Sequence, residues 1–318
     1  MNTKKRILVA MILIVMAFCT GCSNERLEEQ AAFREKGIAL LEQEKYEDAL
    51  QAFNNALGLA LGKIGEVEKD ICYYKAETQY HLGDVEGAKN TYTTMIAYNG
   101  DAKAYFLRGN LYYSLGEEEK ALKDYAEAVK NDANNYELYI GVYDALLVHD
   151  KEKEAKGYLK QALEISGDTV YDKMQKGRIH YFLGENEKAV SFLEEAIKAN
   201  NMLAYYYLAE IQYEMGDVGN AQANMDVYMK SDEADSYHLF SIANHHLLKG
   251  NTDIAIDCLN AALELEPLPN KQAIMQALVI AYEQKLDFAS AKQMMEQYIV
   301  EYPDDEDALR ENIFLQTR

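Results

Sequence analysis

Two histidines, His238 and His245, are spaced so that they could share one face of a helix and hold a divalent metal there. Seven residues correspond to about two helical turns, which supports that placement. The sequence lacks the His-Glu-x-x-His pattern of helical metal sites, and the neighbouring His246 falls at a position expected to pack inside the protein. We therefore predict no metal site and no cofactor.

Other residue patterns with catalytic potential are incomplete. The segment from Gly58 to Lys63 has part of a phosphate-binding loop, but its spacing is one residue short and no Ser or Thr follows the lysine. The acidic clusters at 117–119 and 304–307 fall in expected turns and at the C-terminal edge, which is typical of solvated surface. We nominate no catalytic residue and predict a protein that is not an enzyme, although a nucleophile arrangement assembled only by folding stays open.

The charge of the chain is strongly acidic. Its 318 residues include 53 Asp and Glu against 32 Lys and Arg, which gives a formal net charge of −21. Such a surface repels phosphate backbones, so we predict no nucleic-acid binding. Hydrophobic residues make up 49% of the chain and only three residues are Pro, a composition that indicates a folded protein.

Residues 1–21 have the composition of a secretory signal sequence. The bases Lys4, Lys5 and Arg6 precede an apolar run, Ile7 to Phe18, and small residues follow it. As a helix this run would span ~18 Å, which is too short for a hydrocarbon core of ~30 Å. A permanent transmembrane helix is therefore the weaker interpretation.

The Cys-Thr-Gly segment at 19–21, followed by Cys22, resembles the lipobox of bacterial lipoproteins. In that family the cysteine after the small residue receives a diacylglycerol group and becomes the mature N-terminus. The resemblance implies lipidation of Cys22, a short tether over residues 22–29 and a location on the extracytoplasmic side of the bacterial cell membrane. The alternative is that Cys22 is an exported thiol near a cleavage site.

Residues 30–304 repeat one motif with a period near 34 residues. The sharpest copy begins at Ala102 and reads AKAYFLRGNLYYSLGEEEKALKDYAEAVKNDANN. When each copy is numbered from its first residue, position 20 is always Ala, position 24 is always large and apolar, and position 8 is small in six copies. The eight copies begin at Gln30, Lys69, Ala102, Tyr136, Val170, Met202, Ser236 and Gln272.

Each repeated position has a physical reason. Small residues at positions 8 and 20 would let two helices approach closely, and the large residue at position 24 would fill the space between one hairpin and the next. Position 15 is Gly in five copies, which suits a left-handed turn between helices. The pattern resembles the tetratricopeptide repeat, and the resemblance implies an all-α fold, a right-handed superhelical solenoid of eight helix-turn-helix repeats.

Three stretches depart from the motif. The extra residues from Gly58 to Lys63 are interpreted as a lengthened second helix. The fourth copy has Tyr143 at position 8 and no Gly in its turn, which predicts a splayed or shifted hairpin. Residues 305–318 are amphipathic and are predicted to form a C-terminal capping helix. Its apolar side is predicted to consist of Ala308, Leu309, Ile313 and Phe314.

The resemblance also implies a concave groove lined mainly by the first helix of each repeat. Tyrosine and phenylalanine there offer large contact area, and an asparagine could bind the main chain of a peptide through both amide atoms. About half of these tyrosines are expected to pack between neighbouring helices instead. The candidate partner-binding residues are Tyr73, Glu77, Tyr80, Phe106, Asn110, Tyr113, Arg178, Tyr181, Tyr206, Glu210, Tyr213, Phe240 and Asn244.

The charges of the groove are mostly acidic, which favours a basic or polar partner over an acidic one. The family's clamp for acidic chaperone tails requires Lys at position 5, where the sole base here is Arg34. We therefore predict a membrane-tethered scaffold that binds an envelope protein or peptide. The alternative is a lipoprotein that stacks a glycan or cell-wall fragment on the same aromatic face. The exposed ends of such an array also allow homo-oligomers.

Overall fold

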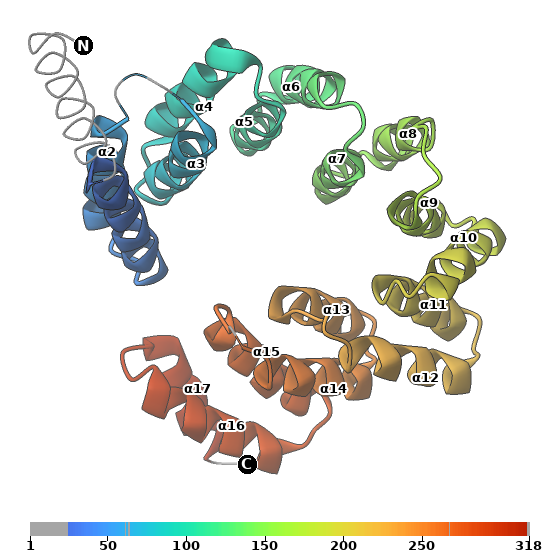
Figure 1. Ribbon diagram of the computed structural model, residues 1–318. Coiled ribbons are helices and arrows are strands. Elements are labelled where there is room, and N and C mark those ends of the chain that lie inside the picture. Colours follow the sequence, from blue (N-terminus) through green and yellow to red (C-terminus); the bar gives the residue numbers. More distant parts are fainter. Residues whose placement is uncertain (1–24, 61, 63, 267, 317–318) are drawn as a thin grey trace, which may run out of the picture. The chain divides into compact units, whose positions relative to one another are not determined.

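The computed structural model describes residues 25–60, 62, 64–266 and 268–316. This part of the chain is helical and contains no strand, which confirms the all-α fold. None of its helices combines the length and apolarity needed to cross a membrane. The predicted signal sequence and Cys22 lie outside the described residues. The helices divide into two compact units, Met1–Ile165 and Ser166–Arg318, and within each unit consecutive helices pack as hairpins (Figure 1).

Unit 1 contains the first four repeats. A helix over residues 25–42 packs against α2, where Gln30 Nε2 donates to the Ala56 carbonyl at 3.2 Å. Each later pair of helices corresponds to one copy of the motif. The labelled helices are α2 (Tyr46–Gly58), α3 (Glu66–His81), α4 (Val85–Asn99), α5 (Ala102–Ser114), α6 (Glu118–Asn131), α7 (Tyr136–Val148) and α8 (Glu152–Ala162).

Unit 2 contains the last four repeats and one further helix, α17. Its helices are α9 (Val170–Phe182), α10 (Asn186–Lys198), α11 (Leu203–Glu214), α12 (Val218–Met229), α13 (Ser236–Leu248), α14 (Thr252–Leu263), α15 (Lys271–Gln284), α16 (Phe288–Glu301) and α17 (Glu306–Leu315). The predicted helix after the eighth repeat is therefore present.

The repeated positions form the core of each hairpin. Alanine at position 20 is at most 1% exposed in every copy, and the residue at position 24 is at most 8% exposed. In three hairpins the residue at position 24 covers a glycine at position 8 of the same hairpin, not only the gap to the next one. A Cβ atom added to each glycine would lie too close to the side chain of its partner. The pairs, with the distance from that Cβ to the nearest side-chain atom, are Gly37 and Phe53 (2.5 Å), Gly109 and Tyr125 (2.7 Å), and Gly177 and Leu193 (2.8 Å).

Every hairpin turn places a left-handed residue at position 15. Five of these residues are glycines, with φ between 72° and 80°. Glu44, Asp150 and Leu286 take the same conformation in the other three turns, with φ of 58°, 57° and 62°. Because Asp150 supplies the turn and Ala155 is fully buried, the fourth hairpin keeps the register of the others. The predicted shift of register is therefore wrong.

Leu286→Gly is expected to raise the free energy of unfolding by about 0.5–1 kcal/mol. A left-handed conformation costs a side-chain-bearing residue roughly 1–2 kcal/mol, and the greater chain entropy of glycine offsets part of the gain. Little packing is lost, since Leu286 is 74% exposed. Urea unfolding measures the change. Gly250→Leu, at the same position of the preceding turn, should have the opposite sign, and a destabilising Leu286→Gly would contradict the argument.

The extra residues between the first two repeats form a connection and not a longer helix. The second helix of the first repeat ends at Gly58, and α3 begins at Glu66. Gly62 has a φ of 71°, and the Gly65 amide donates to Glu68 Oε2 at 2.8 Å, which fixes the start of α3. Glycines that permit a turn and a cap therefore overturn the lengthened-helix interpretation.

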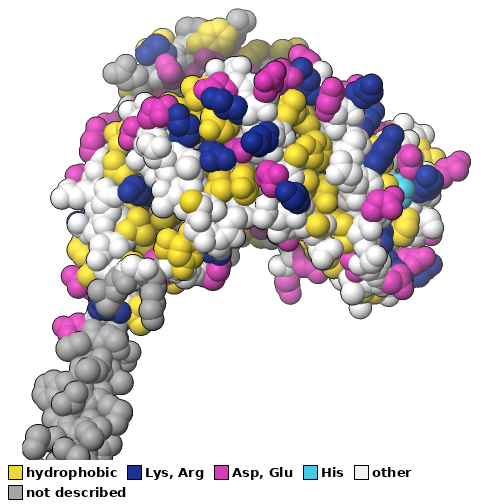
Figure 2. Space-filling view, turned by 90° about the horizontal axis from the view of Figure 1, so that it is seen from above, with side chains coloured by type: hydrophobic (Ala, Val, Ile, Leu, Met, Phe, Trp, Pro, Cys, Tyr) yellow, Lys and Arg dark blue, Asp and Glu magenta, His cyan; other side chains and the backbone are white. Residues whose placement is uncertain are grey.

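The capping helix buries only one residue of its predicted apolar side, Ala308. Ala308 and Leu315 are at most 6% exposed, whereas Leu309, Ile313 and Phe314 are 40%, 68% and 43% exposed. Polar contacts hold the start of α17 against α16. Asp305 accepts from the Ala308 amide at 3.0 Å and from the Tyr298 hydroxyl of α16 at 2.6 Å. On the face shown in Figure 2, exposed hydrophobic side chains lie among acidic and basic ones.

Glu283 of α15 is expected to make unfolding depend on pH. Partial burial, and then a hydrogen bond with Glu311 of α17, raise its pKa from 4.5 to about 7. The folded state therefore binds this proton more tightly than the unfolded chain, so stability is lost as pH rises from about 4.5 through 7. Urea midpoints between pH 5 and 8 should fall less in Glu283→Gln than in the parent. Identical pH profiles would contradict the role of this carboxyl.

Candidate functional site

A cleft of about 580 Å³ lies in unit 1, lined by residues of α3, α4 and α5. Its α3 residues lie three, four, seven and ten positions after the first of them, so they share one face of that helix. They are Asp70, Tyr73, Tyr74, Glu77 and Tyr80. The other lining residues are Ala88 and Tyr92 of α4, and Lys103, Leu107, Asn110, Leu111 and Ser114 of α5.

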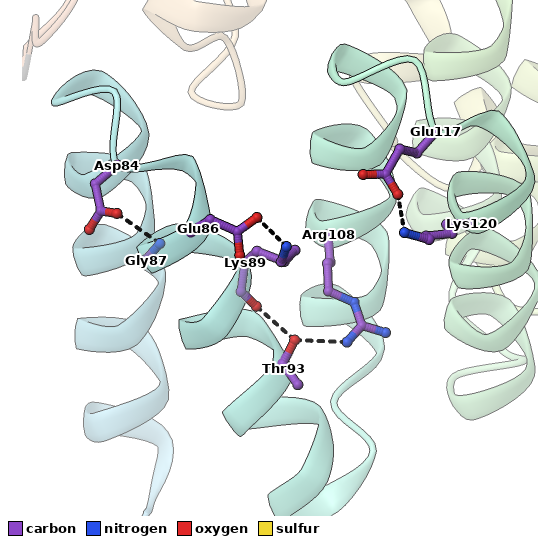
Figure 3. Close-up of polar contacts among 8 residues, drawn as sticks. All are labelled: Asp84, Glu86, Gly87, Lys89, Thr93, Arg108, Glu117 and Lys120. Carbon is purple, nitrogen blue, oxygen red and sulfur yellow. Dashed lines mark hydrogen bonds and ion pairs between the residues drawn. The ribbon is translucent and has the colours of Figure 1, made fainter.

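Arg108 of α5 joins the helices that form the cleft. Its Nη1 donates to Thr93 Oγ1 of α4 at 2.9 Å, and that hydroxyl donates in turn to the Lys89 carbonyl at 2.7 Å (Figure 3). Its Nε and Nη2 donate to the carboxylate of Asp124 in α6, at 2.7 and 2.9 Å. Asp124 is only 4% exposed, so this bidentate pair is shielded from solvent. The contacts fix α4 and α5 relative to each other.

Two carboxylates beside the cleft already have cationic partners. Asp70 accepts from Arg34 Nε at 2.6 Å. Asp101 accepts from the Tyr73 hydroxyl at 2.5 Å and lies 3.7 Å from Lys69 Nζ. Burial and then this hydrogen bond raise the pKa of Tyr73 far above its usual value, so the phenol stays neutral.

Other polar groups of the cleft are available to a ligand. Glu77 is exposed and forms no ion pair with any residue that the structure describes. The Tyr92 hydroxyl forms no hydrogen bond within the same part of the chain, and burial and then Glu77 raise its pKa to about 12. Asn110 accepts from the Tyr125 hydroxyl at 2.7 Å, which leaves its Nδ2 for a ligand. The cleft thus offers the Glu77 carboxylate, the Tyr92 hydroxyl and the Asn110 amide to a ligand, among tyrosine rings.

The structure distributes the predicted residues of unit 1 between the cleft and the core. Tyr73, Glu77, Tyr80 and Asn110 line the cleft. Phe106 packs toward Gly141 of α7, where an added Cβ would lie 3.2 Å from its ring. Tyr113 is 8% exposed, and its ring stacks on that of His149 with centroids 4.1 Å apart. Phe106 and Tyr113 therefore pack between helices.

Sequence reasoning missed Tyr74 and Tyr92 as cleft residues. Tyr92 occupies position 24, which the motif assigns to the core, and it is indeed only 8% exposed. Tyr74 follows Tyr73 directly, and its ring also stacks on Phe53 of the first repeat, with centroids 5.8 Å apart. The spacing of the lining residues along α3 was the signal that could have identified Tyr74.

The predicted residues of unit 2 mostly contact one another or the core. The Arg178 guanidinium lies over the Phe182 and Tyr207 rings, 5.5 and 5.6 Å from their centroids. The Tyr181 hydroxyl donates to Glu210 and Glu214 at 3.5 and 3.3 Å. Tyr206 is 8% exposed, and Phe240 packs on the core of the unit. The Tyr213 and His246 rings meet edge to face, and Asn244 is half-buried.

Glu210 is buried against a histidine. His246 Nε2 of α13 lies 2.8 Å from Glu210 Oε1 of α11, and both side chains are 1% exposed. The two groups form an ion pair when the imidazole is protonated. The sequence placed Glu210 in an open groove, whereas in the structure its carboxylate joins two first helices. His246 is at a packing position, as the sequence indicated.

No group of three or more His, Cys, Asp or Glu side chains is arranged to hold a metal ion in the part of the chain that the structure describes. His238, one of the two histidines considered for such a site, has its Nδ1 at 2.6 Å from the Tyr228 hydroxyl.

Family models described as "Tetratricopeptide repeat" match residues 34–88, 73–136, 173–201 and 275–305, which together cover about half of the chain. The chain is 27% identical over 171 residues to a TPR repeat-containing protein of Methanocaldococcus jannaschii, covering 53% of this chain and 30% of that protein. It is 24% identical over 275 residues to DnaJ homolog subfamily C member 3 of Gallus gallus, covering 77% of this chain and 53% of that protein.

A shorter match, 31% identical over 131 residues, covers 38% of this chain and 22% of Hsp70-Hsp90 organizing protein 1 of Glycine max. The chain thus spans about half or less of the length of these relatives. Among solved structures, a tetratricopeptide repeat protein from Parabacteroides merdae aligns with 80% of this chain and 99% of its own, at 16% identity and a TM-score of 0.45. The family matches in both units, together with the eight hairpins, show that the chain belongs to the tetratricopeptide repeat family.

Proposed function

We propose that this protein is a membrane-anchored, extracytoplasmic scaffold that binds a protein or peptide in the cleft lined by α3, α4 and α5. Tetratricopeptide arrays are suited to protein–protein interaction, because stacked hairpins present extended surfaces. The observation that carries the proposal is the cleft itself, where tyrosine rings line the same space as Glu77, a carboxylate with no ion-pair partner among the described residues. Aromatic side chains of this kind provide much of the binding energy in protein interfaces.

Photo-crosslinking in cells tests the cleft. A photoreactive amino acid in place of Tyr80, which lines the cleft and is 50% exposed, should capture a protein partner. The matched control is Tyr98 of α4, which is 53% exposed and does not line the cleft. Capture at 80 and not at 98 supports the proposal. Equal capture at both positions, or carbohydrate and no protein at position 80, would contradict it.

The anchor is tested separately through Cys22. Two acyl chains hold a protein stably on a bilayer, whereas one gives only marginal binding. Cys22→Ala should therefore move the protein from the membrane fraction to the soluble fraction or leave its signal sequence uncleaved. An unchanged membrane fraction with an unchanged molecular mass would argue against lipidation. This result does not depend on the cleft.

A further inference from the structure

Glu77 differs from the other carboxylates beside the cleft because it has no cation of its own. Asp70 is paired with Arg34, and Asp101 lies near Lys69. Glu77 is exposed and has no ion-pair partner among the described residues, yet it lies close enough to Tyr74 and Tyr92 to raise the pKa of both phenols. The cleft therefore combines an unneutralised carboxylate with tyrosine rings.

The protein's own arginines show which group fits such surroundings. The Arg34 guanidinium pairs with Asp70 and lies 5.7 Å from the centroid of the Tyr74 ring. Arg108 pairs with Asp124 and lies over Tyr105 and Tyr112, at 5.6 and 5.7 Å. In both cases one guanidinium contacts a carboxylate and a tyrosine ring. At Glu77 the carboxylate and the rings are present without the guanidinium.

We infer that the cleft takes an arginine side chain of an extended partner segment, with Glu77 as its counter-ion and tyrosine rings around it. The inference rests on the proposed function and specifies the chemistry of the partner. A planar guanidinium forms two parallel hydrogen bonds to a carboxylate, stacks on aromatic rings and loses less hydration than an ammonium group. Arginine is therefore favoured over lysine.

The remaining groups of the cleft suit the main chain of the same segment. The Tyr92 hydroxyl and the Asn110 Nδ2 are donors, and main-chain carbonyls are acceptors. The cleft, at about 580 Å³, has room for residues on either side of the arginine. An acidic segment would meet Glu77 and find only one lysine in the lining, Lys103, whose Nζ already lies 4.3 Å from the centroid of the Tyr73 ring. The net charge of −21 also attracts a cationic segment at low salt.

A short peptide series tests the inference on the full chain. The probe is the terminally blocked peptide Ser-Gly-Arg-Gly-Ser, and its binding is followed by chemical-shift changes of tyrosine resonances. Replacing its arginine with citrulline, which has a similar shape and no charge, should weaken binding more than about tenfold. Glu77→Gln in the protein should weaken binding of the arginine peptide by a similar factor. No binding of the arginine peptide up to about 5 mM, or equal binding of the citrulline peptide, would overturn the inference.

The control variant is Glu119→Gln on α6. It removes the same charge from an exposed position that has no ion pair within the described residues and does not line the cleft. Its affinity for the arginine peptide should stay within about twofold of the parent. If Glu119→Gln weakens binding as much as Glu77→Gln, only the overall charge attracts the peptide, and the specific role of Glu77 is refuted.

Crosslinking at position 80 in the Glu77→Gln background separates this inference from the proposed function. Loss of partner capture in that background supports both the scaffold proposal and the arginine inference. Capture that persists keeps the scaffold proposal and overturns the arginine inference. Failure of the parent to capture any protein counts against the proposed function, while the peptide series still decides whether the cleft recognises arginine.

Discussion

His246→Leu is expected to lower the free energy of unfolding by about 3–5 kcal/mol. The substitution removes a buried partner of Glu210: His246 Nε2 lies 2.8 Å from the Glu210 carboxylate, and both side chains are 1% exposed. The Tyr181 hydroxyl also reaches Glu210, at 3.5 Å, a long contact compared with the one that the imidazole makes. A carboxylate left in these surroundings must either stay charged without its neighbour or take up a proton, and both outcomes destabilise the folded state.

Two further variants distinguish loss of the contact between Glu210 and His246 from altered packing around the new leucine. Glu210→Gln keeps the shape and a polar contact to the imidazole, so it should cost only about 1 kcal/mol. Combining Glu210→Met with His246→Leu removes both polar groups and should bring stability back to within about 1 kcal/mol of the parent. Urea unfolding followed by circular dichroism measures all four proteins. If the double variant is as unstable as His246→Leu, the loss comes from the leucine and not from breaking the contact between Glu210 and His246.

The hairpins and their register could be predicted because each depends on residues of one short segment. Alanine at position 20 and a large residue at position 24 occur in every copy, and both are buried in every copy. The turn at Leu286 could not be predicted, since leucine rarely takes a left-handed conformation, whereas aspartate, as at Asp150, takes it more often than most residues. The packing of each helix pair imposes that conformation, and local sequence does not record it.

The candidate site was harder to predict, because exposure of a first-helix residue depends on the next repeat. Tyr80 and Tyr113 both occupy position 12, yet they are 50% and 8% exposed. His149, at position 14 of the following repeat, stacks on Tyr113. The residue equivalent to His149 in the third repeat is Leu115, which is itself 42% exposed. A column of aromatic residues therefore identifies a helix face without showing which members stay open.

Tyr125→Ala is expected to lower the free energy of unfolding by about 3–5 kcal/mol, the range for loss of a buried ring. Tyr125 is fully buried, and its ring lies directly over Gly109 of the same hairpin. It also stacks with Tyr113, at a centroid distance of 5.9 Å. Alanine would leave a cavity at the centre of the third repeat, next to the cleft. Urea unfolding measures the loss, and a cost below about 1 kcal/mol would contradict the assigned packing.

A compensating pair tests whether Gly109 and Tyr125 are matched in size. Gly109→Ala alone should cost about 1–3 kcal/mol, because its Cβ would lie 2.7 Å from the Tyr125 ring. The seventh repeat has Ala243 and Leu259 at the same two positions, both fully buried. Gly109→Ala combined with Tyr125→Leu reproduces that arrangement and should cost clearly less than the sum of the single changes. Simple additivity would mean that the two positions are not coupled.

The same double variant separates stability from the cleft. Tyr125→Leu removes the hydroxyl that donates to Asn110 Oδ1 at 2.7 Å, so Asn110 is free to turn even where the hairpin packs well. We therefore expect the double variant to recover much of its stability while binding the arginine peptide several-fold more weakly than the parent. Affinity that recovers together with stability would show that Tyr125 acts on the cleft only through packing.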